Sequence, residues 1–213
     1  VKFLREKLVV PADRCYAQTS PLDTGCLFKL AGRISGDGSH NAMFYPPAKP
    51  MQAPAGYDLY TEVRKHDVLL AYPYQSIRPF IRMLLCAAAD PDVVSIKMTL
   101  YRMASDSQIV NALIAAAENG KEVVAMVELR ARFDEQNNID WSKQLEDAGC
   151  TVFYGFDDYK VHSKLTLITS RKDGKYKYLT QIGTGNYNEK TSELYTDLSF
   201  ITTRQEIGEE ASA

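Results

Sequence analysis

Residues that bind metals or form disulfides are scarce in this sequence. Its 213 residues include four cysteines, three histidines and one tryptophan. The cysteines show no C-x-x-C spacing, and none of them stands near a histidine at the spacing of metal ligands. This scarcity argues against a zinc or redox centre. It predicts four free, buried thiols in a protein of the reducing cytoplasm.

A large excess of charge of one sign is also missing. Lysine and arginine number 25 against 27 aspartates and glutamates, which gives a formal net charge of -2. A nucleic-acid binder held by bulk charge is therefore not expected. Apolar runs are too short for a transmembrane helix, and Arg5, Glu6 and Lys7 interrupt the apolar segment that a signal peptide needs. With 45% hydrophobic and 24% charged residues, the composition is typical of a soluble globular protein.

Prolines mark the main boundary along the chain. Four of them fall within nine residues, at Pro46, Pro47, Pro50 and Pro54. Such a stretch cannot hold a helix, and it interrupts the hydrogen bonding of a sheet. We therefore expect residues 1–58 to be the end of one domain plus a linker, and residues 59–213 to form a second domain.

Helical and strand patterns alternate downstream of this boundary. Apolar residues recur at helical spacing in three segments, 75–90, 107–119 and 138–148. Strands are expected between and after them, at 93–99, 122–129, 151–154, 160–169 and 176–182. The β-α-β-α-β order predicts an α/β domain with a largely parallel, mixed sheet flanked by helices.

Two of the predicted strands end next to arginines. The strand at 93–99 leads into Arg102, and the strand at 122–129 leads into Arg132. Because the carboxyl ends of parallel strands meet at one edge of a sheet, both arginines should line one rim. A guanidinium fork fits phosphate oxygens, which suggests an anion site. The alternative is that the arginines pair with acids such as Asp134 on a solvated edge.

The segment 160–167, with the sequence KVHSKLTL, carries the strongest chemical signal. In a strand its side chains alternate between an apolar face and a face that holds Lys160, His162, Lys164 and Thr166. Two lysines beside a histidine favour the neutral imidazole, which is a nucleophile. Their ammonium groups can bind the oxygens of an attacked phosphoryl group. The alternative is a histidine at the edge of a basic strand without a catalytic role.

A glycine-rich element, GTGN, follows at residues 183–186. Its glycines let a backbone approach a ligand closely, and Thr184 and Asn186 add short polar contacts. H-x-K followed by G-[ST]-x-N is the half-site pattern of the phospholipase D-like superfamily. Hydrolases of that superfamily usually carry an aspartate five positions after the lysine, where this chain has Thr169. This difference argues against phosphodiester hydrolysis, though not against phosphoryl transfer to a histidine.

Positive charge is concentrated in the same part of the sequence. Between residues 160 and 178, six lysines and arginines stand against one acid, Asp173. We therefore expect a focused polyanion site around His162, in a chain that is nearly neutral as a whole.

Several long segments together point to one family. They are YPYQS (72–76), DPDVVSIKMTLYR (90–102), AAENGK (116–121), VELRARFDEQNNIDW (127–141), KVHSK (160–164), IGTGNYNEKT (182–191) and LYTDL (194–198). With these segments the chain resembles the long, histidine-phosphorylated (type 1) polyphosphate kinases. The resemblance is dense over residues 68–208. It is looser over residues 1–58, which look like the end of the family's preceding head domain.

This resemblance implies a reaction and a set of site residues. The family transfers the terminal phosphate of ATP reversibly to inorganic polyphosphate through a phosphohistidine, with Mg²⁺ neutralising the nucleotide phosphates. Carried over, His162 becomes the phosphorylated nucleophile, Arg102 and Arg132 belong to the phosphate and magnesium site, and Tyr195 contacts the nucleotide. From their place in the pattern we add four further phosphate ligands, Lys160, Lys164, Thr184 and Asn186. Among these, Lys164 is also expected to have a catalytic role.

The family also has an N-terminal helical domain and a second phospholipase D-like domain. On this basis the chain is an interior segment with half of an active site, and we expect little or no activity from it alone. For the full-length enzyme the resemblance implies a homodimer and is compatible with peripheral membrane association. Two other functions stay open at this point, a phospholipase D-like phosphodiesterase half-site and a non-catalytic polyanion-binding module.

Overall fold

The computed structural model describes residues 2–17, 19, 24–36, 38, 42, 44–45, 49–128, 135–156 and 158–213. Contacts divide the chain into two compact units, Val1–Pro47 and Ala48–Ala213. The first unit contains the helices α1 (Lys2–Leu8) and α2 (Cys26–Gly36), and neither helix buries a side chain. The second unit holds the hydrophobic core and all the predicted site residues that the structure describes.

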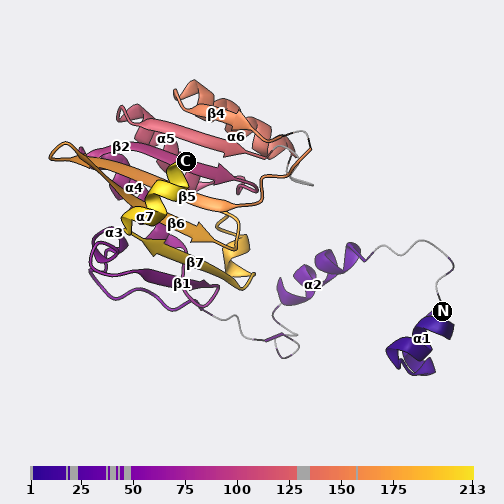
Figure 1. Ribbon diagram of the computed structural model, residues 1–213. Helices are drawn as coiled ribbons and strands as arrows, with labels where there is room; N and C mark the ends of the chain where they lie inside the picture. The colour runs from indigo at the N-terminus through magenta and orange to yellow at the C-terminus, as the bar shows by residue number, and fades with distance from the viewer. Residues whose placement is uncertain are drawn as a thin grey trace. The chain divides into compact units, whose positions relative to one another are not determined.

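The second unit is built on a seven-stranded mixed sheet (Figure 1). Parallel pairing links β2 to β3 and β3 to β4, and the other four pairings are antiparallel. The α/β class and the mixed sheet are confirmed, but the sheet is not largely parallel. In sheet order the strands are β1 (Val68–Tyr72), β7 (Asp197–Thr202), β6 (Lys175–Gly183), β5 (Lys164–Lys172), β2 (Val93–Leu100), β3 (Glu122–Val127) and β4 (Thr151–Tyr154).

A tight hairpin explains why the second half of the sheet is antiparallel. Only Asp173 and Gly174 separate β5 from β6, and both have positive φ, 51° and 74°. Two such residues favour a turn that matches the twist of antiparallel strands. The turn fixes a register in which Lys172 lies opposite Lys175 and Lys164 lies opposite Gly183.

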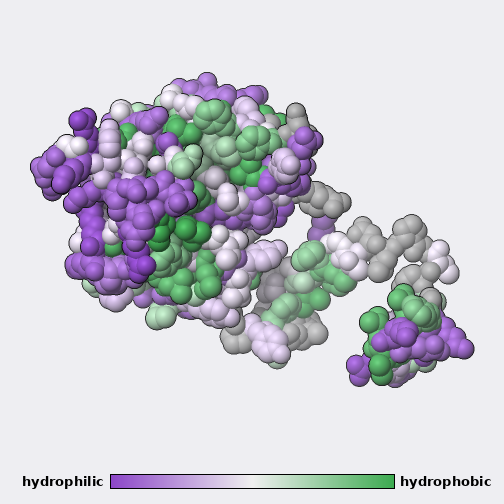
Figure 2. Space-filling view, in the orientation of Figure 1, coloured by the Kyte–Doolittle hydropathy of each residue, from purple (hydrophilic) through white to green (hydrophobic). Residues whose placement is uncertain are grey.

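The hairpin also corrects the expected position of the positive charge. Residues Arg171 to Lys177 form its tip, and β5 spans eight residue steps from Lys172 back to Lys164. At about 3.3 Å per residue, the tip lies about 26 Å from the end of the strand that follows His162. Four of the six positive charges are therefore remote from His162. In Figure 2 hydrophilic residues gather at the edge where Figure 1 shows this hairpin.

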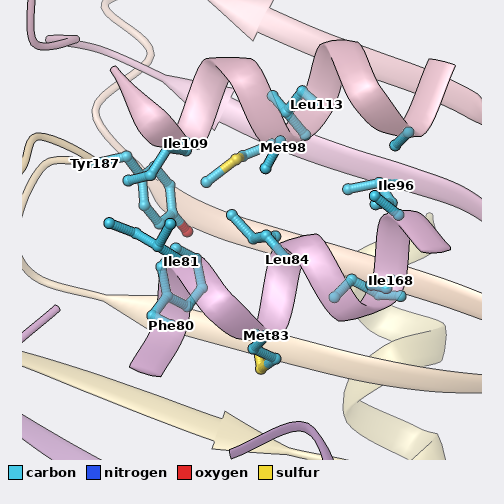
Figure 3. Packing of buried hydrophobic residues seen from close by; sticks show 14 of the residues in the cluster. Phe80, Ile81, Met83, Leu84, Ile96, Met98, Ile109, Leu113, Ile168 and Tyr187 are labelled. Carbon is cyan, nitrogen blue, oxygen red and sulfur yellow. The ribbon is translucent and has the colours of Figure 1, made fainter. Parts of the chain in front are cut away.

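Two amphipathic helices cover one face of the sheet and form the core with it. They are α4 (Arg78–Ala89) and α5 (Gln108–Glu118), and both match their predicted segments closely. Figure 3 shows Leu84 and Leu113 from these helices packed with Met98 and Ile168 from the strands. Burying such side chains contributes about 1.5–3 kcal/mol each, which makes this helix-on-sheet layer the main source of stability.

The remaining helices are short or lie at the edges of the sheet. α6 (Glu135–Asp147) packs beside β4, and α3 (Leu59–Glu62) packs beside α4. α7 (Gln205–Ser212) lies on β6, where a Cβ at Gly208 would collide with Tyr178. In the described part of the chain, no helix combines the length and hydropathy that crossing a membrane requires.

The cysteines are free, but burial differs among them. Cys150 is buried, and burial raises the pKa of its thiol to about 11. Cys15 and Cys86 are half-buried, and Cys26 is exposed. The prediction of four buried thiols is therefore wrong, because two of the cysteines lie in the first unit, whose helices bury nothing.

A buried polar chain crosses three strands beneath the site. Tyr187 is 4% exposed and stacks on Phe80, with ring centroids 5.5 Å apart. Its hydroxyl accepts a hydrogen bond from Thr166 (2.8 Å) and donates one to Gln181. The Gln181 amide in turn donates to Ser199 (2.9 Å). Thr166 is thus fully buried, although the sequence pattern put it on the face of β5 opposite the apolar side chains.

Removing the Tyr187 hydroxyl should destabilise the domain. In Tyr187→Phe the buried polar groups of Thr166 and Gln181 lose their partner, and we expect the free energy of unfolding to fall by about 1–3 kcal/mol. Urea denaturation measures this loss. The matched control is Tyr176→Phe, which removes a hydroxyl from an exposed tyrosine of the same sheet. Equal unfolding midpoints for the two variants would contradict the structural role of the polar chain.

Candidate active site at one end of the sheet

One end of the sheet brings together most of the predicted site residues. β2, β3 and β6 end there, and β5 and β7 begin there, as their pairing registers require. His162 and Lys164 lie at the start of β5, and Arg102 follows β2. Thr184 and Asn186 follow β6, and Tyr195 precedes β7. Arg132 lies outside the described residues.

His162 lies on a loop rather than on a strand. β5 begins at Lys164, so residues 160–163 form the end of the connection from β4. Lys160 and His162 are exposed, whereas Lys164 is only 4% exposed. The three side chains therefore do not share one strand face, and that prediction is wrong. The backbone of residues 161–165 is hydrogen-bonded by side chains from the ends of the neighbouring strands. In a strand, the backbone of an adjacent strand would form these hydrogen bonds.

Two side chains fix the backbone on either side of His162. The Glu128 carboxylate accepts a hydrogen bond from the Val161 amide (3.0 Å). The Thr99 hydroxyl donates to the Ser163 carbonyl (2.8 Å) and accepts from the Leu165 amide (3.0 Å). Glu128 is 3% exposed, and hydrogen bonds to a charged acceptor are among the stronger ones in proteins. The loop is therefore tied to the ends of β2 and β3.

Tyr101 packs against both His162 and Lys164. Its ring meets the imidazole edge to face, with centroids 5.1 Å apart and planes at 74°. The Lys164 ammonium lies 5.0 Å from the centre of the same ring, within the range of a cation–π contact. Asn138, fully buried on α6, donates to the backbone carbonyls of Tyr101 (2.9 Å) and Glu128 (3.0 Å). One buried amide thus joins the two strand ends that position the loop.

Lys164 is a buried cation with an acidic neighbour. Its ammonium donates to the His162 carbonyl oxygen. Burial lowers the pKa of this ammonium, and the charge of Asp197 acts in the opposite direction. A glycine stands beside Asp197, and a Cβ at Gly185 would collide with the Asp197 side chain. The glycine therefore accommodates a protein carboxylate.

The other residues of the glycine-rich element differ in how far they are already engaged. The Thr184 hydroxyl donates to Asp197 (2.8 Å) and accepts from the Leu198 amide (2.9 Å). Asn186 is half-buried, and its amide oxygen makes no hydrogen bond within the described residues. Tyr195 is 61% exposed on the turn before β7. Of this group, Tyr195 is the exposed side chain, and the Asn186 amide oxygen is buried without a hydrogen bond from the described residues.

The described residues do not provide a magnesium cage. They contain no group of three or more histidine, cysteine, aspartate or glutamate side chains that could hold a metal ion. Arg102, assigned by resemblance to the phosphate and magnesium site, is a cation without an acceptor atom and cannot ligate Mg²⁺. It can bind phosphate oxygens, so its fit is to an anion.

Sequence reasoning missed three residues of this site, namely Glu128, Asp197 and Tyr101. Each lies within a segment that supports the family resemblance, beside the residues that were singled out. Their roles depend on contacts across strands. For Tyr101 and Glu128 the available signal was their place at or just after the end of a predicted strand, because strand ends in α/β folds gather at the binding edge. For Asp197 the pattern gave no such signal, since no strand was predicted there.

Comparison with known proteins identifies the family of the chain. The family model for polyphosphate kinase C-terminal domain 1 matches residues 58–213. The chain belongs to the polyphosphate kinase family. Polyphosphate kinases of Bacillus anthracis and Staphylococcus epidermidis are 44% and 40% identical to it, each over 99% of this chain. The match covers 30% and 29% of their own lengths, so this chain spans about a third of such an enzyme.

Solved structures agree with the family and the fold. The polyphosphate kinase of Porphyromonas gingivalis superposes with a TM-score of 0.68 at 34% identity, over 82% of this chain and 30% of that one. Nuc from Salmonella typhimurium, a phospholipase D family member, superposes with a TM-score of 0.52 at 18% identity, over 68% of this chain and 89% of that one. The second likeness supports the phospholipase D-like fold alone.

The tie between Glu128 and the loop can be measured by hydrogen exchange. In Glu128→Ala the Val161 amide loses a charged acceptor, so its exchange should accelerate about tenfold or more. The control Glu122→Ala removes an exposed carboxylate from the same strand and should leave the Val161 amide unchanged. Core amides such as that of Ala125 report global unfolding. Unchanged protection of Val161 in Glu128→Ala would contradict the assigned hydrogen bond.

The charge balance at Lys164 gives a prediction with a definite sign. Asp197→Asn removes the nearby negative charge, so the pKa of Lys164 should fall further below its ordinary value of 10.5. Between the folded pKa and 10.5 the unfolded chain binds more protons, so stability rises with pH in that window, more strongly in the variant.

Nitrogen-15 NMR of the lysine ammonium group follows this titration. Asp147→Asn, at the C-terminal end of α6 and nine residues beyond Asn138, should leave the pKa of Lys164 unchanged. A rise of this pKa in Asp197→Asn, or no shift at all, would contradict the assigned neighbour.

Proposed function

We propose that this chain supplies the histidine half of a polyphosphate kinase active site, with His162 as the nucleophile. The observation that carries the proposal is the presentation of His162. Its side chain is exposed while the backbone on both sides is hydrogen-bonded, and an aromatic ring and a buried ammonium lie beside it. An exposed nucleophile on a fixed backbone suits phosphoryl transfer, which depends on positioning and charge stabilisation.

The proposed reaction has two balanced steps. A lone pair on one ring nitrogen of His162 attacks the terminal phosphorus of ATP, the nitrogen–phosphorus bond forms, and the bond to the bridging oxygen breaks as ADP leaves with its electrons. A terminal oxygen of polyphosphate then attacks the same phosphorus and displaces the imidazole. Both steps reverse when ADP is the acceptor. The polyphosphate chain thus ends one phosphate longer, and the His162 imidazole returns to its unphosphorylated state.

The neighbouring residues take separate roles in this proposal. Lys164 compensates charge next to the transferred group, and Tyr195 contacts the nucleotide. Lys160 and Arg102 bind phosphate oxygens together with Thr184 and Asn186. Arg132 joins them by family resemblance. Mg²⁺ would neutralise the nucleotide phosphates, and no step here relies on a protein-held metal.

The proposal extends to the organisation of the longer enzyme. We infer that residues 59–213 are the first phospholipase D-like catalytic domain of a cytoplasmic, homodimeric polyphosphate kinase, and that residues 1–58 belong to the preceding domain and its linker. The other half of the site comes from the rest of such an enzyme, so the 213-residue chain alone should form little or no polyphosphate. The full-length enzyme's substrates are ATP and polyphosphate.

A phosphodiesterase function is the weaker alternative. Phospholipase D-like hydrolases usually have an aspartate where this chain has Thr169. That residue is buried in β5 opposite Ser95 and Tyr178, and it offers no carboxylate. The position therefore cannot supply the acid that the hydrolases carry.

Labelling with ATP that is radioactive in its terminal phosphate tests the nucleophile. A polyphosphate kinase that carries this segment at full length should acquire an acid-labile, base-stable label, because phosphoramidates hydrolyse in acid. His162→Ala should remove the label, and the matched control His66→Ala, at another exposed histidine, should retain it. A label that survives His162→Ala would reject His162 as the nucleophile. A labelled enzyme without ATP-dependent polyphosphate formation would instead reject the assigned reaction.

A further inference from the structure

A pocket of about 470 Å³ lies at the hairpin end of β5, remote from His162. Its floor is apolar and buried, and it is formed by Ile168, Leu179 and Tyr60. β7 pairs with residues 180–183 of β6, and the pocket opens beyond the end of that pairing. Its volume falls in the range of small-molecule sites, about 300–1,000 Å³.

Three cations stand around this floor, namely Arg64, Lys172 and Lys177. Neither lysine forms an ion pair with any acidic side chain that the structure describes. The Arg64 guanidinium lies 4.2 Å from the centre of the Tyr60 ring, with half of its side chain exposed. Lys172 and Lys177, which are close to His162 in the sequence, therefore contribute their positive charge to this pocket instead.

The wall also holds two acids, Asp90 and Asp92, against these three cations, so the lining keeps a net charge of +1. Asp90 accepts hydrogen bonds from the Tyr60 hydroxyl (2.8 Å) and the Asp92 amide (2.9 Å), and Arg64 lies 3.4 Å away. Burial acts to raise the pKa of Asp90, but these hydrogen bonds outweigh it and hold the pKa below its usual value. Asp90 is thus engaged by Arg64 and Tyr60, whereas Asp92, Lys172 and Lys177 line the pocket without forming an ion pair with one another.

We propose that this pocket binds a nucleoside di- or triphosphate, at a site separate from His162. The apolar floor of Ile168, Leu179 and Tyr60 suits the flat face of a base, and Lys172 and Lys177 suit the phosphates. Inorganic polyphosphate would use the lysines but leave the apolar floor without a partner. The site binds without reacting, because its walls present no histidine, cysteine or serine–base pair, and it is independent of the chemistry proposed at His162.

An NMR titration of the nitrogen-15-labelled 213-residue chain with ADP tests the site directly. Amides of Ser170, Tyr178 and Leu179 should shift together along one saturable curve, whatever happens at Gly183 and Asn186 near His162. Following the two groups of amides separately keeps this site distinct from the proposed catalytic one.

Two double variants separate specific binding from general charge. Lys172→Ala/Lys177→Ala removes the pocket lysines and should weaken ADP binding at these amides about tenfold or more. Arg171→Ala/Lys175→Ala removes the same charge from the same hairpin, at residues that do not line the pocket, and should change the affinity less than about twofold.

Three outcomes would overturn the proposal. They are the absence of shifts at the pocket amides, equal weakening by both double variants, and binding of tripolyphosphate as tight as that of ADP. The last would show that the apolar floor takes no base. All four substituted residues are exposed, so the variants should fold, and thermal unfolding checks this.

Discussion

The site depends on one constraint, the hydrogen bonding of the backbone around His162 by side chains from two adjacent strands. Glu128 at the end of β3 and Thr99 near the end of β2 bind residues 161, 163 and 165. A loop lacks the backbone hydrogen bonds that a strand forms with its neighbours, and these side-chain hydrogen bonds replace them. The histidine is therefore exposed without being free to move away, which is the condition that a nucleophile for phosphoryl transfer needs.

The rest of the architecture serves this constraint. The parallel strands β2 and β3 end side by side, so their following residues reach the same loop, and buried Asn138 ties the two ends together. Tyr187 joins β5 and β6 below the site through Thr166 and Gln181. The α4 and α5 layer covers the same face of these strands, and Phe80 of α4 stacks on Tyr187. Hydrogen-bonded strands and packed helices thus carry the described part of the site.

Charge at the site is held in a low-dielectric setting. Lys164 is buried next to Tyr101, and Asp197 offsets the cost of burying its ammonium. An arriving phosphate would supply further negative charge beside the same ammonium. The interaction is stronger than at an exposed lysine, because water does not screen it. Geometry and charge therefore converge on the same two residues, the proposed nucleophile and Lys164.

The sequence predicted the periodic elements well and the long-range contacts poorly. α4, α5 and β4 follow from apolar spacing, since each has one buried face or short hydrophobic run. β1 and β7 are not among the expected strands, and β5 begins four residues later than expected, because Glu128 and Thr99 hold residues 160–163 in a loop. The alternation of side chains along the predicted strand put Thr166 on the face opposite the apolar residues. That pattern cannot show that Tyr187, from a later segment, covers this face. Counting positive charges between residues 160 and 178 likewise did not show that β5 carries four of them away from His162.

Chemical phosphorylation of the 213-residue chain tests the central claim most directly. Phosphoramidate, a small phosphoryl donor, needs neither a nucleotide site nor a second half-site. Phosphorus-31 NMR and mass spectrometry would then compare His162 with His66, since both side chains are exposed. The account predicts faster phosphorylation at His162, because its backbone is fixed and Lys164 lies beside it. Equal rates at the two histidines would show that the local structure does not prepare His162 for phosphoryl transfer.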